Sequence, residues 1–229
     1  MESGALTTDS SGNGKTLTNV NSVADGTGVF GGAADLGAAN SSKLLKILEN
    51  LSYLGGAYSI SFWAKLNAEI ASSSWRLIEI TENTTKTSIF VQYNYNAGTR
   101  QLYFDRLKAA VIDQAFTYSI TLGTANWYQI AFVFNGSNLL TGYVNGVSVG
   151  SVAITAGSGS GTISDSFGIG ANYTGAVYSS ALIDDVACFN RELTSAEVLS
   201  IYQGDGWVAS TNYLTNYRPR KRTPGAVSV

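Results

Sequence analysis

The sequence predicts an all-β protein built from roughly a dozen short strands. Short apolar runs recur along its 229 residues and are separated by Gly and Asn clusters, which is the pattern of strands joined by turns. Hydrophobic residues make up 45% of the chain, enough for a substantial core, so disorder is excluded as the main state. Only 13% of the residues are charged, which predicts a surface covered mainly by hydroxyl and amide groups.

Individual strands follow from local patterns. Residues 58–66 alternate, and five apolar residues fall on one face: Tyr58, Ile60, Phe62, Ala64 and Leu66. Residues 127–134 are apolar on both faces, as is typical of a central strand. Asn145-Gly146 is a strong two-residue hairpin signal, and it predicts pairing of the flanking strands 139–144 and 147–154. The other expected strands are 74–81, 87–93, 100–104, 163–170 and 181–189.

One short helix is expected near the end of the sandwich. Thr194 and Glu197 have the spacing of a capping box, with Thr194 as N-cap. Leu193 and Val198 are placed for a hydrophobic staple across this cap. Gly204 supplies the left-handed residue that commonly ends a helix.

Composition excludes several classes of function. The chain has no histidine, which removes Ser-His, Cys-His and His-metal mechanisms. Its one cysteine, Cys188, can form neither an internal disulfide nor a zinc cage, and its alternation with apolar positions predicts an inert core thiol. A net charge of −2 gives no basic field for nucleic acid. No 18-residue apolar run is present, so no membrane insertion is expected, and the start lacks a signal-peptide pattern.

Four segments resemble, in order, the laminin-G-like jelly roll of the concanavalin A-like lectin/glucanase superfamily. They are DSSGNG at 9–14, YSISFWAK at 58–65, NWYQIA at 126–131 running into GYVNG at 142–146, and LIDDVACFNRELTSAE at 182–197. The resemblance implies a two-sheet antiparallel jelly-roll sandwich over residues 1–205, with one short C-terminal helix. Residues 206–229 would then form an extended basic C-terminal arm.

The same resemblance implies a structural calcium ion, Ca2+, that ties the amino-terminal loop to the last long strand. Carried over to this chain, its ligands would be Asp9, Asn13 and Asp184, with Asp185 as the alternate. Asp184 shares a predicted face with apolar residues such as Val186, where a carboxylate needs donors or a cation. The alternative is that Asp9 and Asn13 make only turn hydrogen bonds and that Asp184 accepts backbone N–H bonds.

Exposed aromatic side chains beside amides and carboxylates are typical of sugar-binding sites. Six aromatic residues lie at expected strand ends or in loop-like segments: Trp75, Tyr93, Tyr95, Tyr103, Tyr173 and Tyr178. The first four are the preferred ligand-binding candidates, and the alternative for each of them is packing. Trp63 and Trp127 belong to the strand motifs and are expected in the core.

Catalysis is not expected. Glucanases of the superfamily carry closely spaced acidic residues that alternate along one strand, so that two carboxylates face the cleft. The nearest pair here is Glu79 and Glu82, and three residues along a strand place two side chains on opposite faces. The adjacent Asp184 and Asp185 diverge in the same way. A glycoside hydrolase is therefore the third alternative.

The C-terminal arm is the most basic part of the chain. Four of its 14 basic residues fall within 218–222, beside both prolines. The arm is too polar to fold alone, so we expect it to bind a neighbouring subunit through two groups of residues. The residues expected to make apolar contacts with that subunit are Trp207, Tyr213, Leu214 and Tyr217. The residues expected to form ion pairs with its acidic side chains are Arg218, Arg220, Lys221 and Arg222. The alternatives are a solvated tail or an added edge strand on its own sandwich.

These observations together favour a non-catalytic surface or structural protein. The lectin-like sandwich would be displayed on a larger assembly, such as a virion or a cell-surface appendage, and anchored by the arm. Neighbouring protein subunits are the expected partners, glycans are possible ligands, and nucleic acid is disfavoured. The alternative is a carbohydrate- or protein-binding adhesion module with no role in an assembly.

Overall fold

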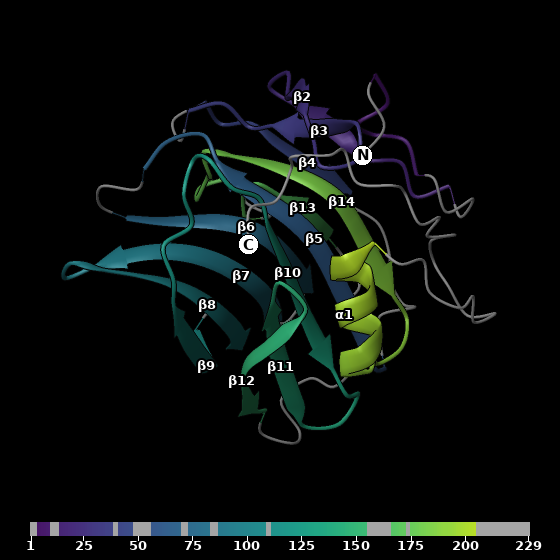
Figure 1. Ribbon diagram of the computed structural model, residues 1–229, viewed down its shortest axis with the longest axis vertical. Helices are drawn as coiled ribbons and strands as arrows, with labels where there is room; N and C mark the ends of the chain where they lie inside the picture. The colour runs from purple at the N-terminus through teal and green to yellow at the C-terminus, as the bar shows by residue number, and fades with distance from the viewer. Residues whose placement is uncertain are drawn as a thin grey trace.

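The computed structural model describes residues 4–9, 14–38, 41–47, 56–69, 73–82, 87–108, 111–154, 166–172 and 175–204. Within these ranges the chain forms two seven-stranded antiparallel sheets, here called sheet A and sheet B, which pack face to face (Figure 1). Sheet A runs in the order β1 (Thr18–Val20), β4 (Leu44–Ile47), β13 (Ser166–Ile169), β6 (Ser73–Glu82), β7 (Thr87–Asn96), β8 (Thr99–Lys108) and β9 (Val111–Ser119). Sheet B runs in the order β12 (Val147–Ala153), β11 (Leu139–Val144), β10 (Tyr128–Phe134), β5 (Tyr58–Leu66), β14 (Ala181–Phe189), β3 (Gly32–Asp35) and β2 (Ala24–Thr27). The predicted jelly-roll sandwich is confirmed.

The main core fills the space between the two sheets. The predicted face of β5 belongs to it, because Tyr58, Ile60, Phe62, Ala64 and Leu66 are each no more than 1% exposed. Sheet A contributes apolar residues that alternate along its strands, among them Ile78, Ile80, Val91 and Phe104. Since side chains alternate across a strand, the residues between these positions must face outward. The outer face of sheet A therefore carries other side chains, and those at its centre, Arg76, Glu79, Phe90 and Asp105, are 7%, 2%, 2% and 0% exposed.

The helix α1 (Ser195–Gln203) lies against the outer face of sheet B (Figure 1). Its predicted capping box is formed, because the Glu197 N–H donates to the Thr194 hydroxyl and the Glu197 carboxylate accepts from the Thr194 N–H. Gly204 ends the helix with a φ of 71°. Leu193 and Val198 pack in the same apolar cluster, as the staple requires. In the described ranges no helix is long and apolar enough to cross a membrane.

The hairpin between β11 and β12 is also as predicted. Asn145 and Gly146 have φ angles of 50° and 79°, as a type I′ turn requires. The turn packs against α1, because a Cβ on Gly146 would lie 2.9 Å from the Leu199 Cδ1 atom and 3.0 Å from the Leu199 Cα atom.

Five strands were not expected from the sequence, namely β1 to β4 and β9. The first four are three or four residues long, too short for an alternating pattern to be recognised. β9 alternates, but it mixes Asp, Gln, Thr and Ser with its apolar residues. Its own composition does not predict a strand, and its strand structure depends on pairing with β8, a long neighbouring strand.

Replacing Gly146 by alanine should lower the free energy of unfolding by about 2–4 kcal/mol. The left-handed backbone costs a residue with a Cβ roughly 1–2 kcal/mol, and the contact with Leu199 adds a similar amount. Gly98→Ala is the matched control, because Gly98 also has a positive φ (87°) but no atom lies within 4 Å of the added Cβ. Urea unfolding of both variants measures the difference, and equal losses would contradict a steric contact between the hairpin and α1.

Candidate functional site

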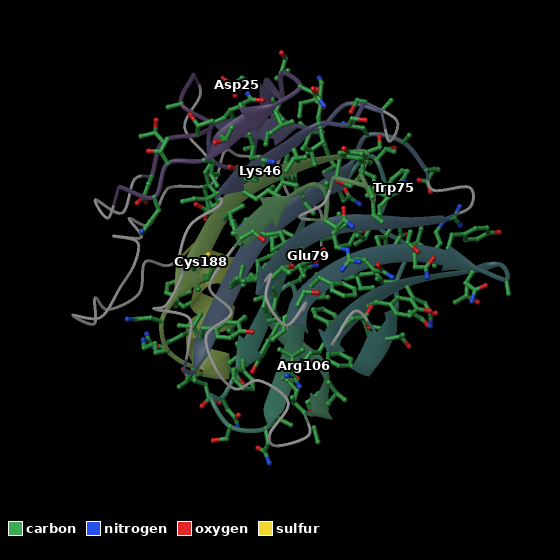
Figure 2. All side chains as sticks on the ribbon, turned by 180° about the vertical axis from the view of Figure 1, so that it is seen from behind. Asp25, Lys46, Trp75, Glu79, Arg106 and Cys188 are labelled. Atoms are coloured by element: carbon green, nitrogen blue, oxygen red, sulfur yellow. The ribbon has the colours of Figure 1, made fainter. Side chains whose placement is uncertain are left out.

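A row of side chains crosses the outer face of sheet A at its centre. Glu79 on β6 pairs with Phe90 on β7, Phe90 pairs with Asp105 on β8, and Asp105 pairs with Ala115 on β9. Figure 2 looks toward sheet A and labels Glu79 near the middle of its strands. Because Glu79 lies between the core residues Ile78 and Ile80, its carboxylate must face outward.

Arg76 joins this row because β6 contains a β-bulge. The register shifts between Arg76 and Ile78, so that Arg76 and Glu79, three residues apart, reach the same side. The Arg76 Cζ atom lies 3.2 Å from the centre of the Phe90 ring, and its Nη1 atom lies 3.4 Å from the Glu79 Oε2 atom. The guanidinium therefore stacks on the aromatic ring that separates the two carboxylates.

Glu79 is almost completely buried and has several partners. Its Oε1 atom accepts a hydrogen bond of 2.8 Å from the Thr81 hydroxyl, and Ser88 also donates to it. Burial raises the pKa of Glu79, while Arg76 and the two hydroxyl groups oppose this shift. Glu79 is thus held as part of an ion pair on the sheet.

Asp105 lacks such partners. Its side chain is fully buried, and among the described residues neither carboxylate oxygen accepts a hydrogen bond. Burial raises the pKa of Asp105 to about 7, and the charge of Arg76 only partly offsets the effect. On its other side lies Ala115, whose small side chain is exposed.

A group of polar side chains continues from Asp105 along β8 and β9. We call Gln101, Tyr103, Thr117 and Ser119 the polar ladder. The Gln101 Nε2 atom lies 3.4 Å from both the Thr117 and the Ser119 hydroxyl oxygens, and the Tyr103 hydroxyl lies 3.3 Å from the Gln101 Oε1 atom. These hydrogen bonds are long, and Thr117 and Ser119 are exposed. A ligand with several hydroxyl groups could replace them at little cost.

Of the four preferred aromatic candidates, only Tyr103 lies on this face. The exposure expected for Trp75 and Tyr93 is wrong, because both are core residues, 6% and 0% exposed, and face sheet B. Tyr95 also packs against the core at the end of β7, where the Arg100 Cζ atom lies 5.1 Å from its ring centre. Trp63 and Trp127 are buried, as expected, but they lie in a separate apolar cluster with Phe30 on the outer face of sheet B. Tyr178 is half-buried, and Tyr173 lies outside the described residues.

The predicted calcium ligands are only partly described. Asp184 is fully buried, and its two carboxylate oxygens accept N–H groups, one from Phe30 at 3.0 Å and one from Asp185 at 2.6 Å. Asp9 accepts from the Lys15 N–H at 2.8 Å. Asn13 lies outside the described residues.

These contacts favour the hydrogen-bonding alternative for Asp184 and Asp9. Among the described residues no group of three or more Asp, Glu, Cys or His side chains could hold a metal ion. The donors around Asp184 are N–H groups, whereas calcium takes six to eight oxygen ligands. The carboxylate instead clamps the 28–31 loop, and a Cβ on Gly28 would collide with it. The calcium site stays a prediction.

A β-bulge in β14 corrects the predicted arrangement around Asp184. The register shifts between Asp184 and Ala187, and Asp185 has a φ of 46°. Val186 therefore packs against the core between the sheets, while Asp184 lies on the outer face of sheet B. Cys188 also packs toward the core, and burial raises the pKa of its thiol to about 12, with a further contribution from the charge of Asp9. The prediction of an inert thiol is consistent with this pKa.

The predicted arm residues lie outside the described residues. They are Trp207, Tyr213, Leu214, Tyr217, Arg218, Arg220, Lys221 and Arg222.

Comparison with protein families confirms the resemblance to the superfamily that the four sequence segments suggested. A model of the concanavalin A-like lectin/glucanases superfamily matches residues 36–199, more than half of the chain. The chain belongs to this superfamily. No curated protein sequence matches it.

Solved structures with the superfamily fold cover most of the chain at low identity. The heptameric SAP-like pentraxin from Limulus polyphemus is 15% identical over 71% of this chain and 76% of its own, with a TM-score of 0.56. The binding domain of botulinum neurotoxin DC, in complex with SialylT, is 14% identical over 86% of this chain and 48% of its own, with a TM-score of 0.63. This chain thus spans about half of that toxin domain.

A third similar structure is domain 4 of AbnA, a GH43 extracellular arabinanase from Geobacillus stearothermophilus, in complex with arabinotriose. It is 18% identical over 82% of this chain and 87% of its own, with a TM-score of 0.57. At these identities the comparisons show a common fold.

Replacing Asp184 by alanine should lower the free energy of unfolding by roughly 3 kcal/mol or more, because the buried Phe30 N–H and the part-buried Asp185 N–H lose a charged acceptor. If the carboxylate acts only as a clamp, a chelator should leave the melting temperatures of both proteins unchanged. A wild-type melting temperature that falls on chelation, with no fall in the variant, would contradict the clamp and support the calcium site.

Asp105 should make stability depend on pH. Its pKa is raised from 3.8 to about 7 in the folded state, so its contribution to stability is complete below about pH 4 and is lost as the pH rises through 7. Asp105→Asn should therefore be more stable than the wild type at pH 8, by up to the order of 4 kcal/mol, and gain little at pH 4. Urea unfolding at the two pH values measures this, and an equal effect at both would contradict the assignment.

Proposed function

We propose that this chain is a non-catalytic carbohydrate-binding module whose ligand lies across β8 and β9 on the outer face of sheet A. The observation that carries the proposal is the polar ladder, a half-exposed aromatic ring surrounded by amide and hydroxyl groups. Sugars are bound by this combination, because the ring covers an apolar face while the polar groups exchange hydrogen bonds with sugar hydroxyls. Domain 4 of AbnA, which has the same fold, was solved with arabinotriose.

A hydrolytic role has less support, although Glu79 and Asp105 share a face. Two strand spacings place their Cα atoms roughly 10 Å apart. The space between them is taken by Phe90 and by the Arg76 guanidinium stacked upon it. In a hydrolase the scissile bond would occupy that space. Glu79 could act as nucleophile or base only if its carboxylate were not already paired with Arg76.

We further propose that the module is displayed on a larger assembly, a virion or a cell-surface appendage, through its C-terminal arm. The support is the charge of the arm, with four basic residues within 218–222, in a chain of net charge −2. Basic side chains of one copy would pair with acidic side chains of the next. An adhesion module without an assembly role is the alternative, and the superfamily fold is compatible with both.

Tyr103→Ala should weaken binding of a neutral oligosaccharide by about tenfold, because one stacking surface and one hydrogen-bonding hydroxyl are lost. The ligand is first found on a glycan array and then titrated by calorimetry, and it should be recovered uncleaved. Tyr178→Ala is the control, since it removes another half-buried tyrosine. The site is misplaced if Tyr178→Ala abolishes binding while Tyr103→Ala does not.

Removing residues 207–229 should prevent self-association without unfolding the sandwich. Light scattering at rising concentration should give a mass above 24.1 kDa for the full chain and a monomer for the truncated one. Circular dichroism should show the same strand content in both. A full chain that stays monomeric at every concentration would rule out anchoring between copies.

A further inference from the structure

The two sheets have four edge strands, and β12 differs from the other three. Sheet A ends at β1 and β9, and sheet B ends at β2 and β12 (Figure 1). β1 and β2 are three and four residues long, and β2 and β9 contain Asp25 and Asp113. β12 has seven residues, Val147–Ala153, with neither a charge nor a proline. Natural proteins protect a long edge with charges, prolines or a covering segment, so β12 is the edge best suited to receive another strand.

The backbone of β12 is accessible on the side away from β11. None of its seven residues is buried, and Ser148, Ser151 and Ala153 are exposed. The Ile154 N–H donates to the Asn138 carbonyl at 2.6 Å, next to the start of β11. Because backbone groups alternate in direction along an antiparallel strand, those of Ser151 and Ala153 point away from β11. Among the described residues no strand pairs with them.

The exposed apolar side chains of the described part of the chain gather around this edge. The large hydrophobic residues that remain exposed there are Val147, Leu139 and Leu199, at 62%, 38% and 38%. Val147 is the first residue of β12, and Leu139 pairs with Ala153, the last. Leu199 on α1 packs against Gly146, which directly precedes β12. Apolar side chains that collect at one edge indicate contact with another protein segment.

The first half of the C-terminal arm has the composition of a matching strand. Residues 207–217 carry no charge, and six of the eleven are Trp, Tyr, Val or Thr, which are enriched in strands. Residues 115–164, which include β10, β11 and β12, carry no charge either, so pairing would leave no charge without a partner. Arg218 and Pro219 end the segment, since proline cannot donate to a ladder. The preceding residues 211–217 equal β12 in length.

We propose that residues 211–217 of one copy add to the edge of β12 in a second copy as an antiparallel strand. The inference rests on the proposed anchoring by the arm and names the surface that receives it. Tyr217 would lie opposite Val147 and cover an apolar side chain that is otherwise exposed. Thr211 would lie opposite Ala153, at the other end of the strand.

The basic residues of the arm also favour the antiparallel direction. With Tyr217 beside Val147, residues 218–222 would continue past the start of β12. The last turn of α1 lies there, because a Cβ on Gly146 would be 3.1 Å from the Tyr202 Cβ atom. That turn contains no basic residue. Since the carboxyl end of a helix attracts cations, arginine and lysine side chains from the arm would be stabilised beside it.

The place where α1 ends favours a second copy over the arm's own sandwich. Gly204 follows Tyr202 by two residues, so the chain leaves the helix beside the start of β12. To pair antiparallel with its own β12, the arm would first have to run the length of that strand, about 24 Å. Residues 205–211 would be used by this path, and a two-residue turn would leave only 214–217 before Arg218. The arm of a second copy can enter from the other end of β12.

The first test blocks the edge in the full chain. Ser151→Pro removes an N–H that points away from β11 and so keeps the ladder to β11, and Ser151→Lys places a charge at the same position. Both variants should weaken self-association at least tenfold, so that light scattering gives a mass of 24.1 kDa where the wild type is larger. Thr27→Lys is the control, because it adds the same charge to an exposed residue of β2, the opposite edge of sheet B, and should associate like the wild type.

The outcomes separate this inference from the function on which it rests. Circular dichroism first establishes that each variant is folded, and Ser151→Lys decides the test if Ser151→Pro is not. Association that is lost without residues 207–229 but kept in the folded Ser151 variants would overturn pairing on β12 and leave anchoring by the arm standing. A full chain that is monomeric at every concentration would overturn both.

A second test distinguishes exchange between copies from an arm that folds back. One full-length variant carries Ala153→Cys and another carries Thr211→Cys, and oxidation of their mixture should link two chains into a species of twice 24.1 kDa. Paired residues of antiparallel strands have Cα atoms about 4.5–5.5 Å apart, a separation that a disulfide spans. Each variant alone is the control, and Cys188, whose pKa burial raises to about 12, should stay unreacted.

A chain with both substitutions completes this test. A disulfide within that chain, together with no linked pair in the mixture, would show that the arm folds back and would overturn the exchange. A disulfide in neither arrangement would overturn the pairing itself.

Discussion

Side-chain alternation along the strands controls every other feature of this molecule. One face of each sheet is used to build the common core, so any residue that carries chemistry must lie on an outer face. Sheet B covers its outer face with α1 and with the 28–31 loop. Sheet A instead places a guanidinium and two carboxylates, all of them buried, and the partly exposed polar ladder on its outer face.

Two β-bulges modify this alternation around two of the three buried carboxylates, Glu79 and Asp184. In β6 the bulge brings Arg76 to the same face as Glu79, and without it the ion pair could not form. In β14 the bulge separates Asp184 from Val186, so that the carboxylate meets the 28–31 loop while the apolar side chain joins the core. A bulge changes which residues share a face, and so each site depends on one extra residue in a strand.

Sequence patterns predicted the parts of the fold that local chemistry determines. The face of β5, the Asn145-Gly146 hairpin and the Thr194 cap each depend on residues close together in the chain. The row from Glu79 through Phe90 to Asp105 could not be predicted, because strand pairing brings together residues 26 positions apart. Trp75 and Tyr93 were misassigned since an aromatic residue in a strand is equally compatible with either face. Only the register and the burial show that they point into the core.

Stability does not explain the buried charges on the outer face of sheet A. A buried ion pair gains little over an apolar pair of similar size, and an unpaired buried carboxylate costs free energy. Asp105 is such an unpaired buried carboxylate. Its cross-strand neighbours, Phe90 and Ala115, are apolar, which shows that this part of the sheet accommodates apolar residues. A sandwich selected for stability alone would have no use for an acid at this position. Because the carboxylate is fully buried, it destabilises the folded state once the pH rises through about 7 and Asp105 ionises.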